Sequence, residues 1–162
     1  MKKKASVLGA GSWGCALALN LARNNYSVNL WTLSEKQTEE INNKRTNEVY
    51  LPGIIIPDNI TATTDIESAL KDSEIIVLAV PSQAIRGICT KIKPFVHKNQ
   101  ILIDVAKGLE KGTGLKMSEI CELELPNMPY AVLSGPSHAE EVAQNLPITV
   151  TVASSDIEMA KK

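Results

Sequence analysis

The sequence has few of the features that mark disulfide-bonded, metal-binding or membrane proteins. Its three cysteines, Cys15, Cys89 and Cys121, lie far apart and form no C-x-x-C pair. This spacing argues against a disulfide framework and a zinc site, and it fits a reducing compartment, so we expect a cytoplasmic protein. No apolar run is long enough to span a bilayer. Residues 1–4 look like the charged part of a signal peptide, but the apolar run after them breaks at Gly9 and is too short for export.

A strong charge of either sign is also missing. The 17 lysines and arginines nearly balance the 18 aspartates and glutamates, for a net charge of −1. A balanced surface does not attract nucleic acid or an anionic membrane, so we expect neither as a partner. The sequence has no catalytic carboxylate pair, no Cys/His cluster and no nucleophile turn. His97 and His138 lack the spacing of a metal site or a catalytic triad, so we interpret them as surface or structural residues and predict no metal site.

The chain does have enough apolar residues for a core, and its segments alternate regularly. Apolar residues make up 44% of the 162 residues, which predicts a single globular domain. Apolar patterns predict strands at 4–8, 27–31, 60–63, 74–80, 101–105, 130–133 and 148–152. Helix patterns or capping boxes lie between them, at 15–22, 34–37, 64–71, 82–93, 115–123, 137–140 and 155–158, and 42–57 is an irregular excursion. The predicted fold class is α/β, a doubly wound, mostly parallel sheet of the Rossmann type.

The strand expected at 4–8 runs into a turn that fits the pattern G-x-G-x-x-G at Gly9, Gly11 and Gly14. In a dinucleotide-binding turn the first glycine permits the tight turn and the second lets the backbone approach a pyrophosphate. The third lets the helix pack close to the strand. The free N–H groups at the helix start then favour the phosphates. An incidental glycine-rich turn is the alternative, but the flanking strand and small-residue helix favour dinucleotide binding.

Three more loops with residues suited to a ligand follow predicted strands: Pro81-Ser82, Ala106-Lys107-Gly108 and 134–137. Because the carboxyl ends of parallel strands share one edge of the sheet, we expect all four loops to converge there. Lys107 either neutralises a phosphate or polarises a carbonyl, or is a solvated turn residue. Ser137 is either a substrate ligand or a helix cap. Trp13 offers a flat face to a cofactor, and we interpret Asp104 as a structural hydrogen-bonding residue.

These residues together resemble the N-terminal half of bacterial NAD(P)-dependent glycerol-3-phosphate dehydrogenase. The matching stretches recur in order over essentially the whole chain: Gly9-Ala-Gly-Ser-Trp-Gly14, Tyr50-Leu-Pro-Gly53, Val80-Pro-Ser82, Lys107-Gly108 and Leu133-Ser-Gly-Pro-Ser137-x-Ala139-x-Glu141-Val142. The resemblance implies cofactor contacts from the glycine turn together with Ser12, Trp13, Tyr50, Lys107 and Ala139. It implies substrate contacts from Lys107, Gly135 and Ser137.

The resemblance also implies a reaction, the reversible reduction of dihydroxyacetone phosphate to sn-glycerol 3-phosphate with NAD or NADP. The product feeds glycerophospholipid synthesis. The family's proton-transferring lysine lies in a helical second domain beyond residue 162, so the resemblance places no catalytic residue within this chain. We therefore expect 1–162 to be the dinucleotide-binding domain of a longer protein, and a homodimer to form through the second domain. The helix that starts at 155–158 and has too few residues to finish agrees with this expectation.

Two departures from the family bear on the site. Ala106 stands where the family usually has serine, which removes a hydroxyl. After the second strand, where the family often has histidine or arginine, the sequence reads Thr32-Leu-Ser-Glu-Lys36. No aspartate stands directly at the strand end to accept the ribose hydroxyls, and Ser34 and Lys36 can donate to a 2′-phosphate, so we favour NADP, although Glu35 opposes this. Two alternatives stay open: the cofactor domain of another hydroxyacid or sugar-nucleotide dehydrogenase, and a non-catalytic dinucleotide-sensing module.

Overall fold

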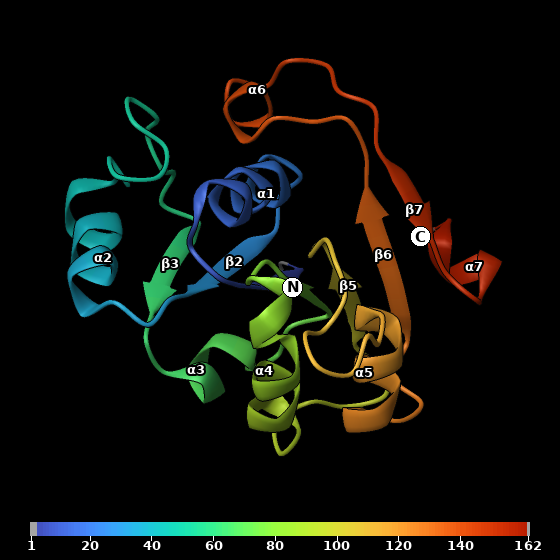
Figure 1. Ribbon diagram of the computed structural model, residues 1–162. Coiled ribbons are helices and arrows are strands. Elements are labelled where there is room, and N and C mark those ends of the chain that lie inside the picture. Colours follow the sequence, from blue (N-terminus) through green and yellow to red (C-terminus); the bar gives the residue numbers. More distant parts are fainter. Residues whose placement is uncertain (1–2, 162) are drawn as a thin grey trace.

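The computed structural model describes residues 3–161, which form one seven-stranded sheet (Figure 1). The strands are β1 (Lys4–Leu8), β2 (Ser27–Trp31), β3 (Ile60–Thr63), β4 (Ile75–Leu78), β5 (Ile101–Asp104), β6 (Tyr130–Ser134) and β7 (Thr151–Ala153). Their order across the sheet is β3-β2-β1-β4-β5-β6-β7. All neighbouring pairs are parallel except β6 and β7, which are antiparallel. The predicted doubly wound, mostly parallel α/β sheet is therefore confirmed.

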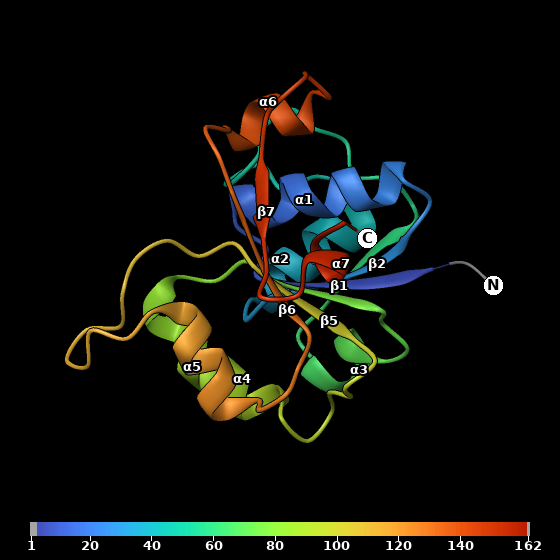
Figure 2. The ribbon, with the colours of Figure 1, turned by 90° about the vertical axis from the view of Figure 1, so that its right-hand side faces the viewer.

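Helices connect the strands and cover both faces of the sheet. They are α1 (Ser12–Arg23), α2 (Glu35–Glu39), α3 (Ile66–Leu70), α4 (Ile85–Ile92), α5 (Met117–Glu124), α6 (Ala139–Ala143) and α7 (Ile157–Ala160). A π-helical turn, η1 (Glu40–Lys44), follows α2, and a 3₁₀ turn, η2 (Ser82–Ala84), leads into α4. Figure 2 shows α1 and α6 on one face of the sheet and α3, α4 and α5 on the other.

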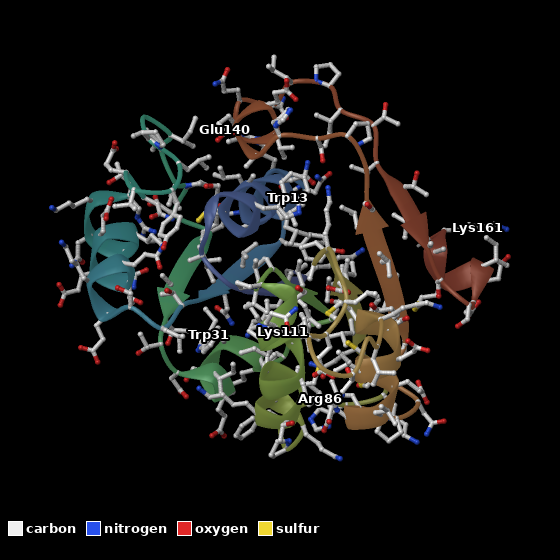
Figure 3. The ribbon with its side chains drawn as sticks, in the orientation of Figure 1. Trp13, Trp31, Arg86, Lys111, Glu140 and Lys161 are labelled. Atoms are coloured by element: carbon white, nitrogen blue, oxygen red, sulfur yellow. The ribbon has the colours of Figure 1, made fainter. Side chains whose placement is uncertain are left out.

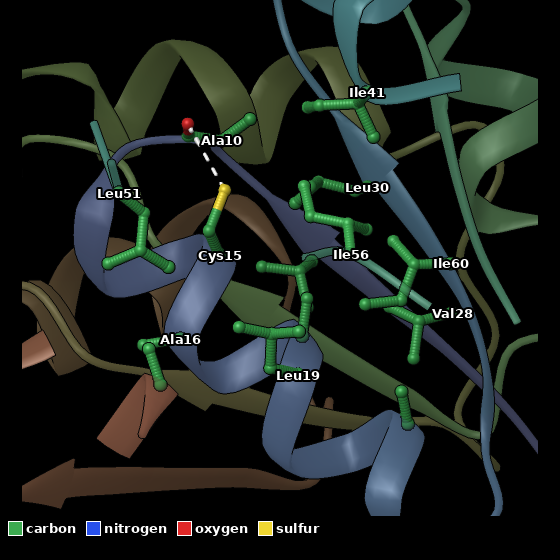
Figure 4. Close-up of a cluster of buried hydrophobic side chains, with 14 of the residues drawn as sticks. Ala10, Cys15, Ala16, Leu19, Val28, Leu30, Ile41, Leu51, Ile56 and Ile60 are labelled. Atoms are coloured by element: carbon green, nitrogen blue, oxygen red, sulfur yellow. Dashed lines mark hydrogen bonds between the residues drawn. The ribbon is translucent and has the colours of Figure 1, made fainter. Parts of the chain in front are cut away.

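Neighbouring residues of β1 point to opposite faces and join two separate cores. Val7 belongs to a cluster built with α1, β2 and β3, part of which is shown in Figure 4. Leu8 belongs to a second cluster built with α3, α4 and α5. Because both faces are covered, β1 and β4 carry nearly continuous apolar residues. Ser6 is the polar exception, and its buried hydroxyl lies 2.5 Å from the Ala69 carbonyl oxygen and 2.6 Å from Ser73 Oγ.

The helix starts differ from the sequence-based expectation in their caps. Ser34 caps α2 as predicted, accepting a hydrogen bond from the first turn. The expected caps Thr64 and Ser155 are wrong by one residue, because Asp65 caps α3 and Asp156 caps α7. Each aspartate accepts two backbone N–H groups with its carboxylate, which a hydroxyl one residue earlier does not do.

The last strand is later and shorter than expected. The apolar pattern predicts a strand at 148–152, but β7 covers Thr151–Ala153. The segment before it packs over the end of β6, where a Cβ on Gly135 would lie 2.6 Å from the Thr149 carbonyl oxygen. The pairing with β6 begins at Thr151, opposite Ser134, so Thr149 lies outside the strand ladder, and the local pattern of residues gives no sign of it.

Among residues 3–161 no helix is both long enough and apolar enough to cross a membrane. The same part of the chain holds no group of three or more side chains that suits a metal ion. Cys15, Cys89 and Cys121 are free thiols, and all three are buried. Residues 1–2 of the charged start, and residue 162, lie outside the described part of the chain.

Candidate functional site

The strand order reverses beside β1, and this reversal places the site. The chain forms β2 and β3 on one side of β1 and then crosses to form β4, β5 and β6 on the other. The loops after β1 and β4 therefore diverge at the carboxyl edge of the sheet, where doubly wound folds bind their ligands. Gly9 follows β1 at this point, and its N–H donates to the Trp31 carbonyl oxygen at 2.9 Å.

The three glycines of the turn are there for different physical reasons. Gly9 has a φ of +116°, and a Cβ on it would lie 2.3 Å from the Ala79 carbonyl oxygen. A Cβ on Gly14 would lie 1.9 Å from the Gly9 carbonyl oxygen, so only glycine lets α1 come this close to the turn. Gly11 caps α1 and has no neighbouring atom within 4 Å of its Cβ position. Packing thus requires the first and third glycines, whereas the second leaves the N–H groups at the start of α1 open to an anion.

A cavity of 320 Å³ opens beside this turn. Its lining includes predicted residues from three loops: Ser12, Trp13, Lys107, Gly135, Ser137 and Ala139. Figure 3 shows Trp13 on the side of α1 that faces β6. The fourth loop lies next to the lysine loop, since a Cβ on Gly108 would be 3.4 Å from Ser82 Oγ. Three of the four predicted loops therefore share one cavity, and the fourth lies next to the lysine loop.

Lys107 follows a turn that is held by a buried carboxylate. Asp104 accepts hydrogen bonds from the Ala106 N–H and the Tyr130 hydroxyl, both at 2.9 Å, so its interpretation as a structural residue is confirmed. Burial raises the pKa of Asp104, and these hydrogen bonds oppose the rise. Lys107 itself is exposed, and none of the ion pairs within residues 3–161 includes it. Its ammonium is thus available to a negatively charged ligand at the cavity.

The predicted capping role of Ser137 is wrong. His138, not Ser137, is the residue before the first turn of α6, and the helix has no side-chain cap. The Ser137 side chain is half-buried at the cavity, and its hydroxyl has no hydrogen bond to another residue of the described part of the chain. Gly135, which precedes it, is required by the packing of Thr149 described above. The structure therefore leaves the Ser137 hydroxyl free for a ligand, and it gives Gly135 a structural role.

Tyr50 lies outside the cavity but is tied to its edge. The backbone carbonyl of Tyr50 accepts a hydrogen bond from Ser12 Oγ at 2.5 Å, so the loop at 47–53 lies against the start of α1. The Tyr50 side chain is exposed, and it does not line the cavity. Among the predicted cofactor-binding residues other than the three glycines, Tyr50 is thus the one that the structure joins to the site only through the backbone.

A network of amide side chains supports the glycine turn, and no pattern in the sequence points to it. The Ala10 carbonyl oxygen accepts hydrogen bonds from Gln37 Nε2 at 2.7 Å and Asn47 Nδ2 at 3.0 Å. It also accepts one from Cys15 Sγ at 3.4 Å, which Figure 4 shows. Gln37 also accepts a hydrogen bond from the Thr32 hydroxyl. Burial raises the pKa of Cys15 to about 11, so its thiol stays neutral at physiological pH. Gln37 therefore does not complete the predicted capping box with Ser34, because its amide is used to hold the turn.

Two larger hollows lie away from this edge. One, of 660 Å³, includes His97 and Gln100 and lies at the amino ends of the strands, and the other, of 490 Å³, lies between α5, β6 and α7. None of the predicted cofactor or substrate residues lines either hollow, so residue chemistry rather than size places the site. His138 lines the small cavity, although from the sequence we interpret it only as a surface or structural residue. Its position between Ser137 and Ala139, two predicted site residues, could have indicated that it lies at the site.

The segment after β2 lies at the other end of the turn, where an adenosine ribose sits in this fold. Ser34 Oγ accepts a hydrogen bond from the Gln37 N–H at 3.2 Å, which leaves its own proton free to donate. Leu33, Glu35 and Lys36 are exposed. The segment thus offers a hydroxyl and one ammonium to a phosphate, with one carboxylate beside them.

Comparisons with known proteins agree with this geometry. Residues 4–160 match the family model described as NAD-dependent glycerol-3-phosphate dehydrogenase N-terminus. The chain is 50% identical over 157 residues to glycerol-3-phosphate dehydrogenase (NAD(P)+) of Clostridium acetobutylicum. The aligned region covers 97% of this chain and 47% of that protein.

Solved structures of two such enzymes have the same fold. The crystal structure from Coxiella burnetii superposes with a TM-score of 0.92 at 38% identity, over 99% of this chain and 49% of that chain. The structure from Saccharomyces cerevisiae gives a TM-score of 0.83 at 35% identity, over 94% and 47% of the two chains. This chain thus spans about half the length of the relatives it matches.

Proposed function

The chain belongs to the NAD-dependent glycerol-3-phosphate dehydrogenase family, and we propose that it is the cofactor-binding half of an oxidoreductase that interconverts dihydroxyacetone phosphate and sn-glycerol 3-phosphate. The observation that carries the proposal is the cavity that joins the open start of α1 to Lys107 and Ser137. A module that only senses a dinucleotide has no need for these residues at the substrate edge. Another dehydrogenase with the same cofactor domain is not expected to have both the Lys107 stretch and the Ser137 stretch at this spacing.

The residues of the turn fit NAD or NADP. The N–H groups that follow Gly11 are uncovered and lie at the positive end of a twelve-residue helix, which suits a pyrophosphate. Ser12 and Trp13 line the cavity. The Ser12 hydroxyl already donates to the Tyr50 carbonyl oxygen, so Ser12 meets a phosphate through its backbone N–H, while the indole face of Trp13 contacts the cofactor. Ala139 lies across from them. When bound, the nicotinamide supplies the hydride for the reaction.

The substrate phosphate and carbonyl are then held by the far wall of the cavity. Lys107 carries the positive charge, Ser137 a free hydroxyl and Gly135 a backbone at the end of β6. A lysine ammonium at this place stabilises the negative charge that develops on the carbonyl oxygen as hydride arrives. Proton transfer is assigned to a residue outside this chain, in a helical second domain that completes the site.

The same proposal places the homodimer contact in that second domain and the enzyme in the cytoplasm. The support for the compartment is the set of buried free thiols at Cys15, Cys89 and Cys121, because Cys89 and Cys121 lie 3.7 Å apart, Sγ to Sγ, without a disulfide. Sedimentation of a full-length enzyme beside the 162-residue chain tests the dimer contact: a dimer of the former and a monomer of the latter are expected. A dimeric 162-residue chain places the contact within this half instead.

The function is tested with two proteins, the 162-residue chain and a full-length enzyme that carries it as its N-terminal half. The full-length enzyme is expected to oxidise NAD(P)H only when dihydroxyacetone phosphate is added. The 162-residue chain is expected to bind the cofactor in a titration but to show no turnover, because it lacks the proton-transferring domain. A full-length enzyme that prefers a hydroxyacid or a sugar nucleotide contradicts the proposal.

For the cofactor we propose a preference for NADP(H). The support is the Ser34 hydroxyl and the Lys36 ammonium beside the end of β2, both exposed and able to bind a 2′-phosphate. Calorimetry with NADH and NADPH on the 162-residue chain tests this preference, with Lys36→Gln as the variant that should reduce it. Tighter binding of NADH by the unmodified chain overturns it.

A further inference from the structure

The loop that carries Lys107 continues into a small hairpin that projects from the body of the protein. Leu109 bridges to Lys116, and the Glu110 N–H donates to the Leu115 carbonyl oxygen at 2.9 Å. In Figure 2 this segment extends outward between β5 and α5. Of its two leucines, Leu109 is exposed and Leu115 is partly buried against the core, so apolar contacts hold only one strand of the hairpin. An isolated two-stranded hairpin is marginally stable in water, so contacts from outside must keep it in one place.

The first outside contact is a side-chain amide at the start of α4. Gln83, in the turn η2, donates from Nε2 to the Leu109 carbonyl oxygen at 2.9 Å. Its Oε1 accepts a hydrogen bond from the Lys111 N–H, also at 2.9 Å. The Gln83 amide therefore pairs with the backbone of two hairpin residues, one before and one after Glu110, as a neighbouring strand would.

The second contact is a forked ion pair to the residue between them. Arg86, on α4, donates to both carboxylate oxygens of Glu110, from Nε at 2.7 Å and from Nη2 at 2.8 Å. Its remaining Nη1 donates to Glu124 on α5 at 2.6 Å, and Figure 3 shows Arg86 between the two helices. The Glu110 side chain is only 14% exposed, and the guanidinium together with the Thr113 hydroxyl lowers its pKa to about 2. A bidentate pair fixes orientation as well as distance, which a single lysine contact does not.

Gln83 and Arg86, which we call the hairpin clamp, thus bind three successive residues that follow the Lys107-Gly108 turn. Lys107 has no ion pair within residues 3–161 to hold its own side chain. The backbone beside it is held on one side by Asp104, which accepts a hydrogen bond from the Ala106 N–H, and on the other by the hairpin. We propose that the hairpin clamp positions Lys107 at the cavity, so that Gln83 and Arg86 are positioning residues for the reaction although neither lines the site. This inference rests on the proposed function.

The test is a double-mutant cycle in a full-length enzyme that carries this chain. Arg86→Gln breaks the fork, and we expect a loss in kcat on the order of tenfold, since small displacements of a catalytic group are costly. The KM for cofactor should stay within about twofold, because the glycine turn is untouched. If Arg86 acts through Lys107, then adding Arg86→Gln to the Lys107→Met enzyme should lower kcat by less than about twofold. Gln83→Ala, which leaves the ion pair intact, should show the same dependence on Lys107.

The matched control is Asp72→Asn, which breaks the ion pair to Lys4 at the opposite edge of the sheet. We expect it to leave kcat unchanged and to act independently of Lys107. Losses from Arg86→Gln and Lys107→Met that multiply in the double variant overturn the inference, as does a lower melting temperature for Arg86→Gln with an unchanged kcat. A parent enzyme without glycerol-3-phosphate dehydrogenase activity refutes the proposed function instead.

Discussion

Ser12 Oγ donates a hydrogen bond to the Tyr50 carbonyl oxygen at 2.5 Å, across a sequence separation of 38 residues. This bond joins the first turn of α1, where we place the cofactor pyrophosphate, to the loop at 47–53. That loop is also held from its other side by Asn47, which donates to the Ala10 carbonyl oxygen within the glycine turn. The turn and the loop therefore form one unit.

Ser12→Ala tests this unit. Removing one hydrogen bond of ordinary net strength, about 0.5–1.5 kcal/mol, is expected to weaken cofactor binding by about three- to tenfold. Amides of residues 48–51 and 53 should also exchange faster with deuterium, because the loop loses its link to α1. The control is Ser155→Ala, at an exposed serine before α7. Unchanged affinity and exchange would show that the bond has no role in the site.

Gly11 and Gly14 are expected to fail in different ways. Gly11→Val should abolish cofactor binding with a loss of less than about 1 kcal/mol in the free energy of unfolding, because the Cβ position is open. Gly14→Ala should cost about 3 kcal/mol or more, because its Cβ meets the Gly9 carbonyl oxygen at 1.9 Å. Calorimetric titration and urea unfolding of both variants separate the two roles. If Gly11→Val binds the cofactor with unchanged affinity, the glycine turn is not part of the binding site.

Lys107→Met should lower kcat/KM of the full-length enzyme on the order of a hundredfold. A hydrogen bond to a charged group contributes roughly 1.5–3 kcal/mol, and each 1.4 kcal/mol is about a factor of ten. The melting temperature should not change, since an exposed lysine supports little of the core. Cofactor affinity should fall less than catalysis. Steady-state kinetics that show less than about a threefold drop make Lys107 a solvated turn residue.

Asp104 predicts a pH dependence of stability. Its pKa is raised by burial, so the folded chain holds this proton more tightly than the unfolded chain. The stabilisation is complete below the unfolded pKa, about 3.9, and is lost as the pH rises through the raised folded value. Asp104→Asn does not titrate at this position. The free energy of unfolding of the unmodified chain should therefore fall relative to that of the variant as the pH rises from about 3. Above the folded pKa the difference between the two proteins should be constant.

Asp65 supplies the control with the opposite sign. Hydrogen bonds, chiefly from the Ser68 hydroxyl, lower the pKa of this exposed carboxylate. Its contribution is therefore present above the unfolded pKa and is lost as the pH falls. Urea unfolding of Asp104→Asn and Asp65→Asn between about pH 3 and pH 7 should give differences from the unmodified chain that run in opposite directions. Differences of the same sign contradict the assignment for Asp104.

Local sequence patterns alone predict the fold class and the position of the glycine turn. Both follow from local patterns: apolar runs that only a sheet covered on both faces accommodates, and glycines where a turn and a close approach require them. The order of the loops along the chain also predicted their convergence, because parallel strands end at the same edge. The family followed from the same stretches.

The folded structure, and not the local sequence, shows which polar side chains stay free at the cavity and which hold the fold together. Ser137 looks like a cap in the sequence, yet its hydroxyl is left free, while Gln37 looks like half of a capping box and instead holds the Ala10 carbonyl. The hairpin clamp and the bond between Ser12 and Tyr50 join residues far apart in the chain. A hydroxyl or amide has several possible partners, and folding selects one by bringing distant backbone within hydrogen-bond reach, which no local pattern records.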